Sequence, residues 1–358
     1  MSRPVEAIVN LANIRSNFAL VGKLAANSRI MAVVKANAYG HGAVPVATAL
    51  AAADAFGVAS LAEAVELREA GITQPVVLLG GVFDRDEMHD VVRYGLQIVV
   101  HSGEQFGHLL AAELRAQIVV WLKIDTGMHR LGFEAQDFAE IRRMLEISGK
   151  VKEVVLMSHF ACADDVDNAT TGHQLAVFET AVASLPGEKS LANSAAVLAY
   201  PQSHYDWVRP GIMLYGANPM LRPLQAHEML VPAMTLRSRL VAIHNIAAGE
   251  SVGYGEQWRA QRPSRIGTVA IGYGDGYPRH ASNGTPVLID GQRVALVGRV
   301  SMDFITVDLT DLPSAASGDE VILWGDGLPV EEVARVAGSI SYQLLTGVQK
   351  RVRRCYLF

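Results

Sequence analysis

Two lysines end apolar runs in this chain, and that placement gives them possible chemistry. Of the seven lysines, Lys35 and Lys123 close such runs. A buried ammonium is costly to desolvate, so it must be paired or have a lowered pKa. A neutral lysine attacks carbonyls and forms Schiff bases. Lys123 lies beside Asp125 and near Arg130, which would keep its amine charged or favour its modification. Lys35 has no acidic neighbour in sequence and is the better nucleophile candidate.

Residues 31–42 do not by themselves establish catalysis. The simpler interpretation of this stretch is a lysine whose chain follows apolar surface until the amine reaches water. The other apolar runs help to decide, because polar side chains follow several of them. These side chains are His129 and Arg130 after residues 119–124, His159 after 154–158, Asn193 and Ser194 after 190–192, and Arg209 and Gly211 after 207–208. In a parallel barrel such strand ends share one mouth, where active sites form.

The segment 209–216 is suited to an anion. Arg209 supplies a guanidinium, and the glycine-associated amides that follow resemble a phosphate site near the last two strands of a barrel. Ser194 offers a hydroxyl to the same phosphate. Residues 272–277 resemble a nucleotide loop, but no helix pattern follows them. The eleven histidines lack metal-ligand spacing, so we expect no metal site.

The elements that must position these residues alternate between apolar runs and amphipathic segments. After an extended segment (5–11) and a helix (12–25), eight strands are predicted: 30–34, 55–59, 75–79, 96–100, 119–124, 154–158, 190–192 and 207–208. Eight strand–helix repeats predict an α/β fold, a closed (β/α)₈ TIM-like barrel. An open doubly wound sheet is the alternative, but it would normally carry a phosphate-binding glycine loop after its first strand.

The pattern changes near residue 217 and shifts toward alternation from about 232. Strands are predicted at 235–244, 299–308 and 320–324, and a lone helix at 330–337. Asp290-Gly291 between two apolar runs is a hairpin signal. We therefore expect a barrel domain over residues 1–225 and a mostly β domain over 226–358.

Composition excludes several classes of protein. Of 358 residues, 50% are hydrophobic and 19% charged, which is typical of a globular protein. The net charge of −5 argues against nucleic-acid binding, and the short basic segment 350–354 is better interpreted as a solvated or interface-forming strand end. We expect no membrane span and no signal peptide, because no long apolar run exists. Two cysteines fit a cytoplasmic protein.

Seven motifs resemble those of bacterial alanine racemase, a fold-type III enzyme dependent on pyridoxal 5′-phosphate. They span essentially the whole chain: residues 32–42 (AVVKANAYGHG), 123–132 (KIDTGMHRLG), 158–160 (SHF), 208–216 (VRPGIMLYG), 252–255 (VGYG), 271–279 (IGYGDGYPR) and 298–303 (GRVSMD). The resemblance implies interconversion of L- and D-alanine, a (β/α)₈ barrel with a β domain after it, and a head-to-tail homodimer.

The resemblance also implies roles for individual residues. Lys35 matches the Schiff-base lysine and Tyr254 the second base. Five residues match the phosphate ligands: Tyr39, Ser194, Gly211, Ile212 and Tyr342. Arg209 matches the arginine that faces the pyridine nitrogen, and His159 the histidine that links this arginine to the second base. Arg130 and Met302 match residues at the substrate carboxylate, and Lys123 matches a lysine that is often carbamylated. Four further residues match those of the substrate-access passage: Asp164, Arg279, Arg299 and Asp303.

These roles are chemically consistent with one another. Racemisation removes the α-proton from one face and returns a proton to the other, so two opposed bases are the simplest design. A phenol is a poor base unless positive charge favours phenolate, which His159 and Arg209 would supply. An arginine cannot keep the pyridine nitrogen protonated, which disfavours transamination and decarboxylation. Because Tyr254 lies in the β domain, we expect it to reach a barrel mouth of the partner subunit.

Other functions compete with this interpretation. One is a racemase for other or broader amino acids, such as serine or lysine, and a second is a related decarboxylase, whose motifs match poorly. A third is a non-catalytic pyridoxal-phosphate-binding barrel, which would lack the last third of the chain and any counterpart of Tyr254. A barrel without a cofactor would have to carry this polar set at its strand ends by chance.

Overall fold

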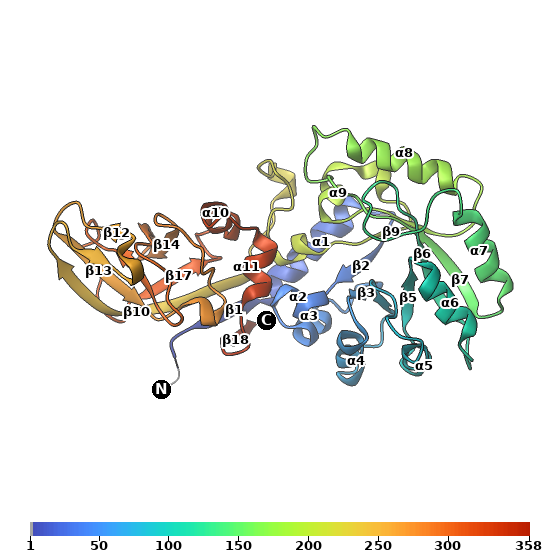
Figure 1. Cartoon of the computed structure of the whole chain (residues 1–358), viewed down its shortest axis with the longest axis horizontal. Coiled ribbons are helices and arrows are strands. Elements are labelled where there is room, and N and C mark those ends of the chain that lie inside the picture. The colour runs from blue at the N-terminus through green and yellow to red at the C-terminus, as the bar shows by residue number, and fades with distance from the viewer. Residues whose placement is uncertain (1–2) are drawn as a thin grey trace.

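Eight parallel strands close into a barrel in the first part of the chain. The structure, a computed structural model, describes residues 3–358. The strands are β2 (Arg29–Val33), β3 (Ala55–Val58), β4 (Val76–Leu78), β5 (Gln97–Val100), β6 (Ile118–Lys123), β7 (Val151–Met157), β8 (Lys189–Ser190) and β9 (Trp207–Val208). The barrel closes where Ile30 of β2 pairs with Val208 of β9. All eight predicted strands are present, with their ends moved by at most three residues, so the predicted barrel is confirmed. Figure 1 shows this part of the chain.

The barrel is packed inside and covered by helices outside. One or two side chains from each of several strands fill its interior, where Trp121 lies edge-on to Trp207 at 5.3 Å between ring centroids. Among residues 3–358, nine helical segments belong to this part: α1 (Leu11–Leu24), α2 (Lys35–Tyr39, with left-handed φ angles from Ala36 on), α3 (Ala43–Ala49), α4 (Leu61–Glu69), α5 (Glu87–Arg93), α6 (Gly103–Ala111), α7 (Phe138–Ile147), α8 (Thr170–Val182) and α9 (Ser194–Ala199). Both faces of the central strand segments are buried, so those segments are apolar, as in 76–78, 98–100 and 118–122, whereas polar residues lie toward the strand ends.

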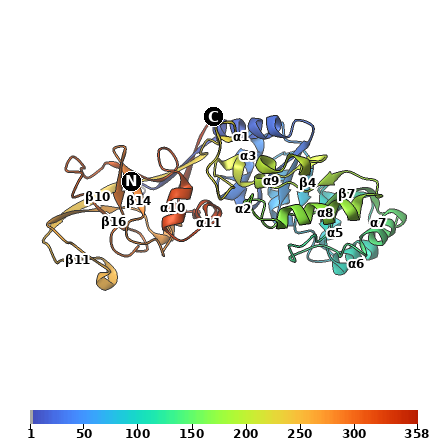
Figure 2. The ribbon, with the colours of Figure 1, turned by 90° about the horizontal axis from the view of Figure 1, so that it is seen from above.

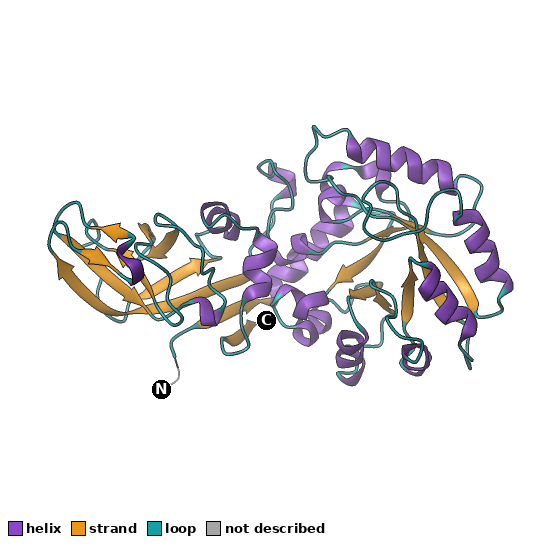
Figure 3. Cartoon of the chain, in the orientation of Figure 1, coloured by secondary structure: helices purple, strands orange, loops and turns teal. Residues whose placement is uncertain are grey.

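The second part of the chain is mostly β, as predicted (Figure 3). Its sheet has eight strands: β1 (Glu6–Asn10), β10 (Met234–Ile246), β13 (Ser264–Val269), β14 (Pro286–Ile289), β15 (Gln292–Ala295), β16 (Ile305–Asp308), β17 (Glu320–Trp324) and β18 (Arg353–Leu357). The N-terminal strand β1 lies between β10 and β18. Both chain ends therefore belong to this sheet, which extends away from the barrel in Figures 1 and 2.

Two predictions for this part need correction. The predicted strand 299–308 is a strand only over β16, because Ser301 and Phe304 close a turn through their backbone (Ser301 N to Phe304 O, 2.9 Å). The predicted lone helix α10 (Val330–Val336) is followed by a second helix, α11 (Ser341–Gly347). The hairpin prediction is confirmed, since Asp290 (φ 47°) and Gly291 (φ 72°) connect β14 and β15 with the positive φ angles of a type I′ turn.

Within residues 3–358, no helix is both long and apolar enough to cross a membrane.

Candidate active site

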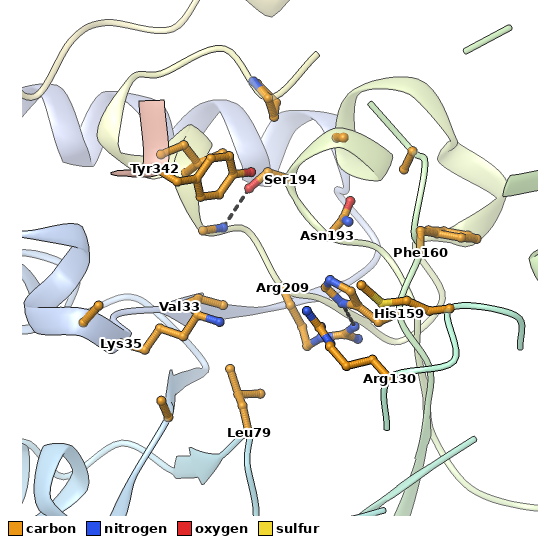
Figure 4. A pocket seen from close by; sticks show the side chains of 18 of the residues that line it. Val33, Lys35, Leu79, Arg130, His159, Phe160, Asn193, Ser194, Arg209 and Tyr342 are labelled. Atoms are coloured by element: carbon orange, nitrogen blue, oxygen red, sulfur yellow. Dashed lines mark hydrogen bonds between the residues drawn. The ribbon is translucent and has the colours of Figure 1, made fainter. Parts of the chain in front are cut away.

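A cavity of about 1010 Å³ opens at the carboxyl ends of the barrel strands, next to α11 (Figure 4). It contains most of the residues predicted for the site: Lys35, Tyr39, Lys123, Arg130, His159, Asp164, Asn193, Ser194, Arg209, Gly211, Ile212 and Tyr342. The structure therefore brings together side chains that the sequence separates by up to about 300 positions. Those predicted from the strand ends, such as Lys35, His159 and Arg209, support the strand-end rule, whereas Asp164 and Tyr342 were expected only from the family resemblance.

Lys35 extends into this cavity from the first residue of α2, two residues after β2 ends (Figure 4). Within residues 3–358, no hydrogen bond or ion pair holds its Nζ. Burial and the positive charge of Arg130 lower the pKa of Lys35, while the nearby Glu63 carboxylate opposes that shift. A larger fraction of the amine is thus neutral and nucleophilic than for a lysine in water.

Tyr39, Ser194 and the backbone N–H of Ile212 form a cradle of hydrogen-bond donors beside Gly211. The Oγ atom of Ser194 accepts the Gly211 N–H at 2.8 Å, so its own O–H is available to another acceptor. A Cβ atom on Gly211 would lie 2.4 Å from the Tyr39 hydroxyl, so only glycine fits at this position. The neighbouring Ile212 N–H has no partner among the described residues. Several donors around one space suit a phosphate group.

The ring of Tyr39 is fixed from behind by Tyr215. The two rings stack with centroids 4.8 Å apart, and the Tyr215 hydroxyl donates to the Val33 carbonyl at 2.9 Å. Tyr342, on α11, approaches Tyr39 from the other side at 6.1 Å between centroids. Burial and the negative charge of Asp164 raise the pKa of Tyr342 to about 12, so its hydroxyl keeps its proton and can donate.

Arg209 lies buried behind the cavity and contacts His159. Its guanidinium donates to the Ser190 hydroxyl and to the Ser158 carbonyl, both at 2.6 Å, and Nη2 lies 3.4 Å from Nδ1 of His159. Burial lowers the pKa of Arg209 to about 10, so it stays protonated at neutral pH. Burial and then the charge of Arg209 hold the pKa of His159 well below its ordinary value, so this imidazole is neutral.

Lys123 is buried among positive charges. Its pKa is lowered to about 8 by burial and by the charges of Arg209 and Arg130, and Asp125 only partly opposes this. Oδ1 of Asp125 accepts three backbone N–H groups, from residues 127–129, at 2.9 to 3.1 Å. With a pKa of about 8 the Lys123 amine is mostly protonated at pH 7, although Arg130 lowers this pKa, and a minor neutral fraction is available for modification.

Five predicted residues do not line the cavity of their own chain: Tyr254, Arg279, Arg299, Met302 and Asp303. Tyr254 lies in the 3₁₀ turn η4 (Tyr254–Glu256), where 71% of its surface is exposed, and Met302 is 55% exposed. The strand β11 (Ser251–Val252), just before Tyr254, lies far from the barrel in Figure 2. A single chain does not bring Tyr254 to Lys35.

The structure also shows a supporting residue that the sequence did not single out. Glu63 accepts the backbone N–H of Ala36 and of Ala59, both at 2.7 Å. The spacing Ser60-x-x-Glu63 indicates a capped helix start, and Ser60 does cap α4. That local pattern gives no sign that the carboxylate reaches the residue after Lys35, since the contact is tertiary.

Comparison with known families matches nearly the whole chain. The family model described as "Alanine racemase, N-terminal domain" matches residues 9–219, and "Alanine racemase, C-terminal domain" matches residues 233–356. An alanine racemase of Chromohalobacter salexigens is 53% identical over 99% of this chain and 98% of its own. A catabolic alanine racemase of Pseudomonas aeruginosa is 50% identical, with 99% of each chain covered.

Solved structures agree with the sequence matches. A biosynthetic alanine racemase from Pseudomonas aeruginosa superimposes with a TM-score of 0.97 at 49% identity, covering 99% of this chain and 100% of that one. An alanine racemase from Bartonella henselae with covalently bound pyridoxal phosphate gives a TM-score of 0.91 at 31% identity, with 99% of each chain covered.

Proposed function

The chain belongs to the alanine racemase family, and from this premise we propose that Lys35 and Tyr254 of a partner subunit are its two opposed bases. The enzyme interconverts L-alanine and D-alanine and depends on pyridoxal 5′-phosphate. The observation that supports the site most directly is the position of the Lys35 amine, which no side chain of the described residues binds, in a cavity that also holds a cradle of donors.

The residues of the cavity fit this cofactor. Lys35 would hold its aldehyde carbon covalently, and the space that a Cβ on Gly211 would fill leaves room beside the Tyr39 hydroxyl for a phosphate. Tyr39, Ser194, Ile212 and Tyr342 would donate to that phosphate, whereas Gly211, whose N–H donates to Ser194, would leave it room. Arg209 would face the pyridine nitrogen. When bound, the cofactor supplies an electron sink for negative charge at the substrate's α-carbon.

The two bases exchange the α-proton between opposite faces. The Lys35 amine would be released when the amino group of the substrate replaces it on the cofactor. It would then take the proton from D-alanine, and the Tyr254 phenolate would take it from L-alanine. In each direction the conjugate acid of the other base returns a proton to the opposite face, so the net change is inversion alone. Each turnover leaves the two protonation states exchanged, and the reverse reaction or solvent restores them.

His159 and Arg209 support the phenolate. Because Nδ1 of His159 faces the donating Arg209, its hydrogen resides on Nε2, which is free to donate to the Tyr254 oxygen. The guanidinium adds positive charge behind the imidazole, and both effects lower the pKa of a phenol placed there.

Arg130 and the backbone N–H of Met302 from the partner would bind the substrate carboxylate. Lys123 would steady Arg130 as a carbamate, because a lysine with a pKa of about 8 carries a minor neutral fraction for reaction with carbon dioxide. Asp164, with Arg279, Arg299 and Asp303 from the partner, would line the passage through which the substrate enters.

We further propose that the enzyme works as a head-to-tail homodimer. The cavity is open in one chain, and the exposed Tyr254 and Met302 have no role in their own chain's site.

We keep a cytoplasmic location and the division into domains 1–225 and 226–358 as predictions. Identities of 50% to a catabolic and 49% to a biosynthetic relative are nearly equal, so they favour neither role over the other.

A chiral assay tests the proposed substrate range. The purified protein, supplied with pyridoxal phosphate, is incubated with a panel of L-amino acids, and the enantiomers are separated. We expect D-alanine to form much faster than any other D-amino acid. Faster racemisation of serine or lysine would show that the enzyme serves a broader or different set.

A further inference from the structure

The residues after Lys35 form one turn of left-handed helix. Ala36, Asn37, Ala38 and Tyr39 have φ angles of 53°, 54°, 51° and 52°, although none of them is glycine. In this conformation each Cβ crowds the following carbonyl oxygen, so the segment is strained and persists only where its surroundings impose it. Strain of this kind next to a functional lysine raises the question of which groups hold the turn.

The first N–H of the turn is held by a carboxylate from a neighbouring helix. The Ala36 N–H donates to Oε1 of Glu63 at 2.7 Å. The second oxygen of the same carboxylate accepts the Ala59 N–H at 2.7 Å, which fixes the side chain between β3 and α4. Glu63 thus ties the start of the left-handed turn to the next strand and helix of the barrel.

The carbonyl of Gly40, the residue that follows the turn, is held by a guanidinium from the end of the chain. Nε of Arg354, in β18, donates to the Gly40 carbonyl at 2.7 Å, and its Nη2 donates to the Val348 carbonyl at 2.9 Å. Gly40 itself is in close contact with α11, because a Cβ there would lie 2.2 Å from the Leu345 carbonyl oxygen. The second part of the chain therefore closes directly on the turn.

The interior of the turn has its own supports. Nδ1 of the buried His41 lies 3.1 Å from the Ala38 carbonyl and 3.0 Å from the Tyr39 carbonyl, so this nitrogen carries the hydrogen. The His41 ring packs on Tyr215 at 4.6 Å between centroids, and Tyr215 stacks on Tyr39. These contacts fix the middle of the segment, while the two charged groups hold its ends.

We propose that Glu63 and Arg354 are positioning residues that clamp the left-handed turn and thereby set the placement of Lys35 and Tyr39. A negative group at the N-terminal end and a positive group at the C-terminal end both oppose the turn's dipole charges, as in an ordinary capped helix. The two clamps come from the barrel and from the C-terminal sheet, so the site depends on both parts of one chain.

Two pairs of variants test the clamp in the holoenzyme. Glu63→Met and Arg354→Met remove the polar contacts at similar size, while Glu63→Gln and Arg354→Lys retain part of them. Two matched controls are Glu66→Met, at an exposed position on the same helix as Glu63, and Arg353→Met, next to Arg354 in β18. Arg353 forms an ion pair with Glu6 of the neighbouring strand β1. The readouts are hydrogen exchange of residues 35–42, the rate at which hydroxylamine removes the cofactor, and Tm.

We expect both methionine variants to speed exchange in this segment and cofactor removal by about tenfold or more, the loss typical of a charge-assisted hydrogen bond. The Gln and Lys variants should fall between these and the controls. Control-like exchange, or faster exchange without faster cofactor removal, would overturn the proposal. If the methionine variants do not fold, the Gln and Lys variants decide in the same way.

The claim that the turn affects cofactor attachment rests on the proposed function, in which Lys35 is the lysine that holds the cofactor. The two claims fail separately: a cofactor that remains attached in Lys35→Ala refutes the lysine assignment, whereas the exchange rates of residues 35–42 depend only on the backbone contacts of the turn.

Discussion

Nη2 of Arg209 lies 3.4 Å from Nδ1 of His159, and this contact orients the imidazole for work at its other nitrogen. A protonated guanidinium beside Nδ1 makes that atom an acceptor and leaves the hydrogen on Nε2. Burial and the same charge keep the pKa of His159 low, so the ring stays neutral and donates one hydrogen bond from Nε2. His159 and Arg209 are thus arranged to stabilise the phenolate that we propose comes from Tyr254 of the partner subunit.

Replacing Tyr254 by phenylalanine should affect the two directions of proton exchange unequally. The variant loses the base on the face from which L-alanine loses its proton, while Lys35 still serves the other face. In deuterated water we expect exchange of the α-hydrogen to slow far more from L-alanine than from D-alanine. Equal slowing from both enantiomers would contradict the assignment of faces.

Replacing Lys35 by alanine should abolish covalent attachment of the cofactor. We expect the purified variant to lose the visible absorbance of the lysine-bound cofactor, and borohydride should no longer fix pyridoxal to the chain. Lys150→Ala is the control, and we expect it to keep normal absorbance. The Lys150 amine donates a hydrogen bond to the Leu110 carbonyl in α6. A yellow Lys35→Ala protein whose cofactor borohydride still fixes to the chain would contradict the assignment of Lys35 as the cofactor-binding lysine.

Replacing Gly211 by alanine should weaken cofactor binding without unfolding the barrel. The added Cβ would lie 2.4 Å from the Tyr39 hydroxyl, so the tyrosine ring or the turn must move out of the phosphate cradle. We expect the dissociation constant of the cofactor to rise by roughly tenfold or more, the effect of one lost charge-assisted hydrogen bond. Gly107→Ala, in α6 with nothing near its Cβ, should leave binding unchanged.

His41 should contribute to acid sensitivity of the fold. Burial lowers the pKa of His41 to about 4 from its ordinary value of 6.5, against the opposing hydrogen bonds to Tyr39 and Ala38. The unfolded chain therefore binds a proton below pH 6.5 that the folded chain does not bind until about pH 4. This contribution to stability is complete above pH 6.5 and is lost as the pH falls, by about 2 kcal/mol at pH 5.

A His41→Gln variant isolates this contribution, because glutamine retains a donor but does not titrate. Thermal unfolding at pH 7 and pH 5 should show a smaller loss of stability for the variant than for the wild type. Other buried histidines, such as His101 and His204, titrate in both proteins and cancel in the comparison. An identical loss in both would show that His41 is not the group responsible.

Much of the barrel could be predicted from the sequence because most of its strands contain a short apolar run, as in 76–78 and 118–122. The polar residues after those runs, such as His159 and Arg209, followed from the rule that barrel sites form at strand ends. The hairpin at Asp290 was also readable, because its turn needs positive φ angles that Asp-Gly supplies.

What the sequence did not reveal depends on tertiary contacts. The turn after Lys35 is left-handed because Glu63 and Arg354 hold it, and neither contact leaves a local pattern. Residues 299–304 alternate like a strand, yet a backbone turn at Ser301 interrupts them. The helix α11 was missed because it is short and buries only a few apolar side chains.

The central claim, that each active site combines Lys35 of one chain with Tyr254 of another, is tested most directly by mixing subunits. Lys35→Ala and Tyr254→Phe proteins are separately inactive or nearly so, and are dissociated together and reassembled. Each mixed dimer has one intact site, so random reassortment of equal amounts predicts about a quarter of wild-type racemase activity. No recovery, although mixed dimers are shown to form, would contradict a site built from two chains.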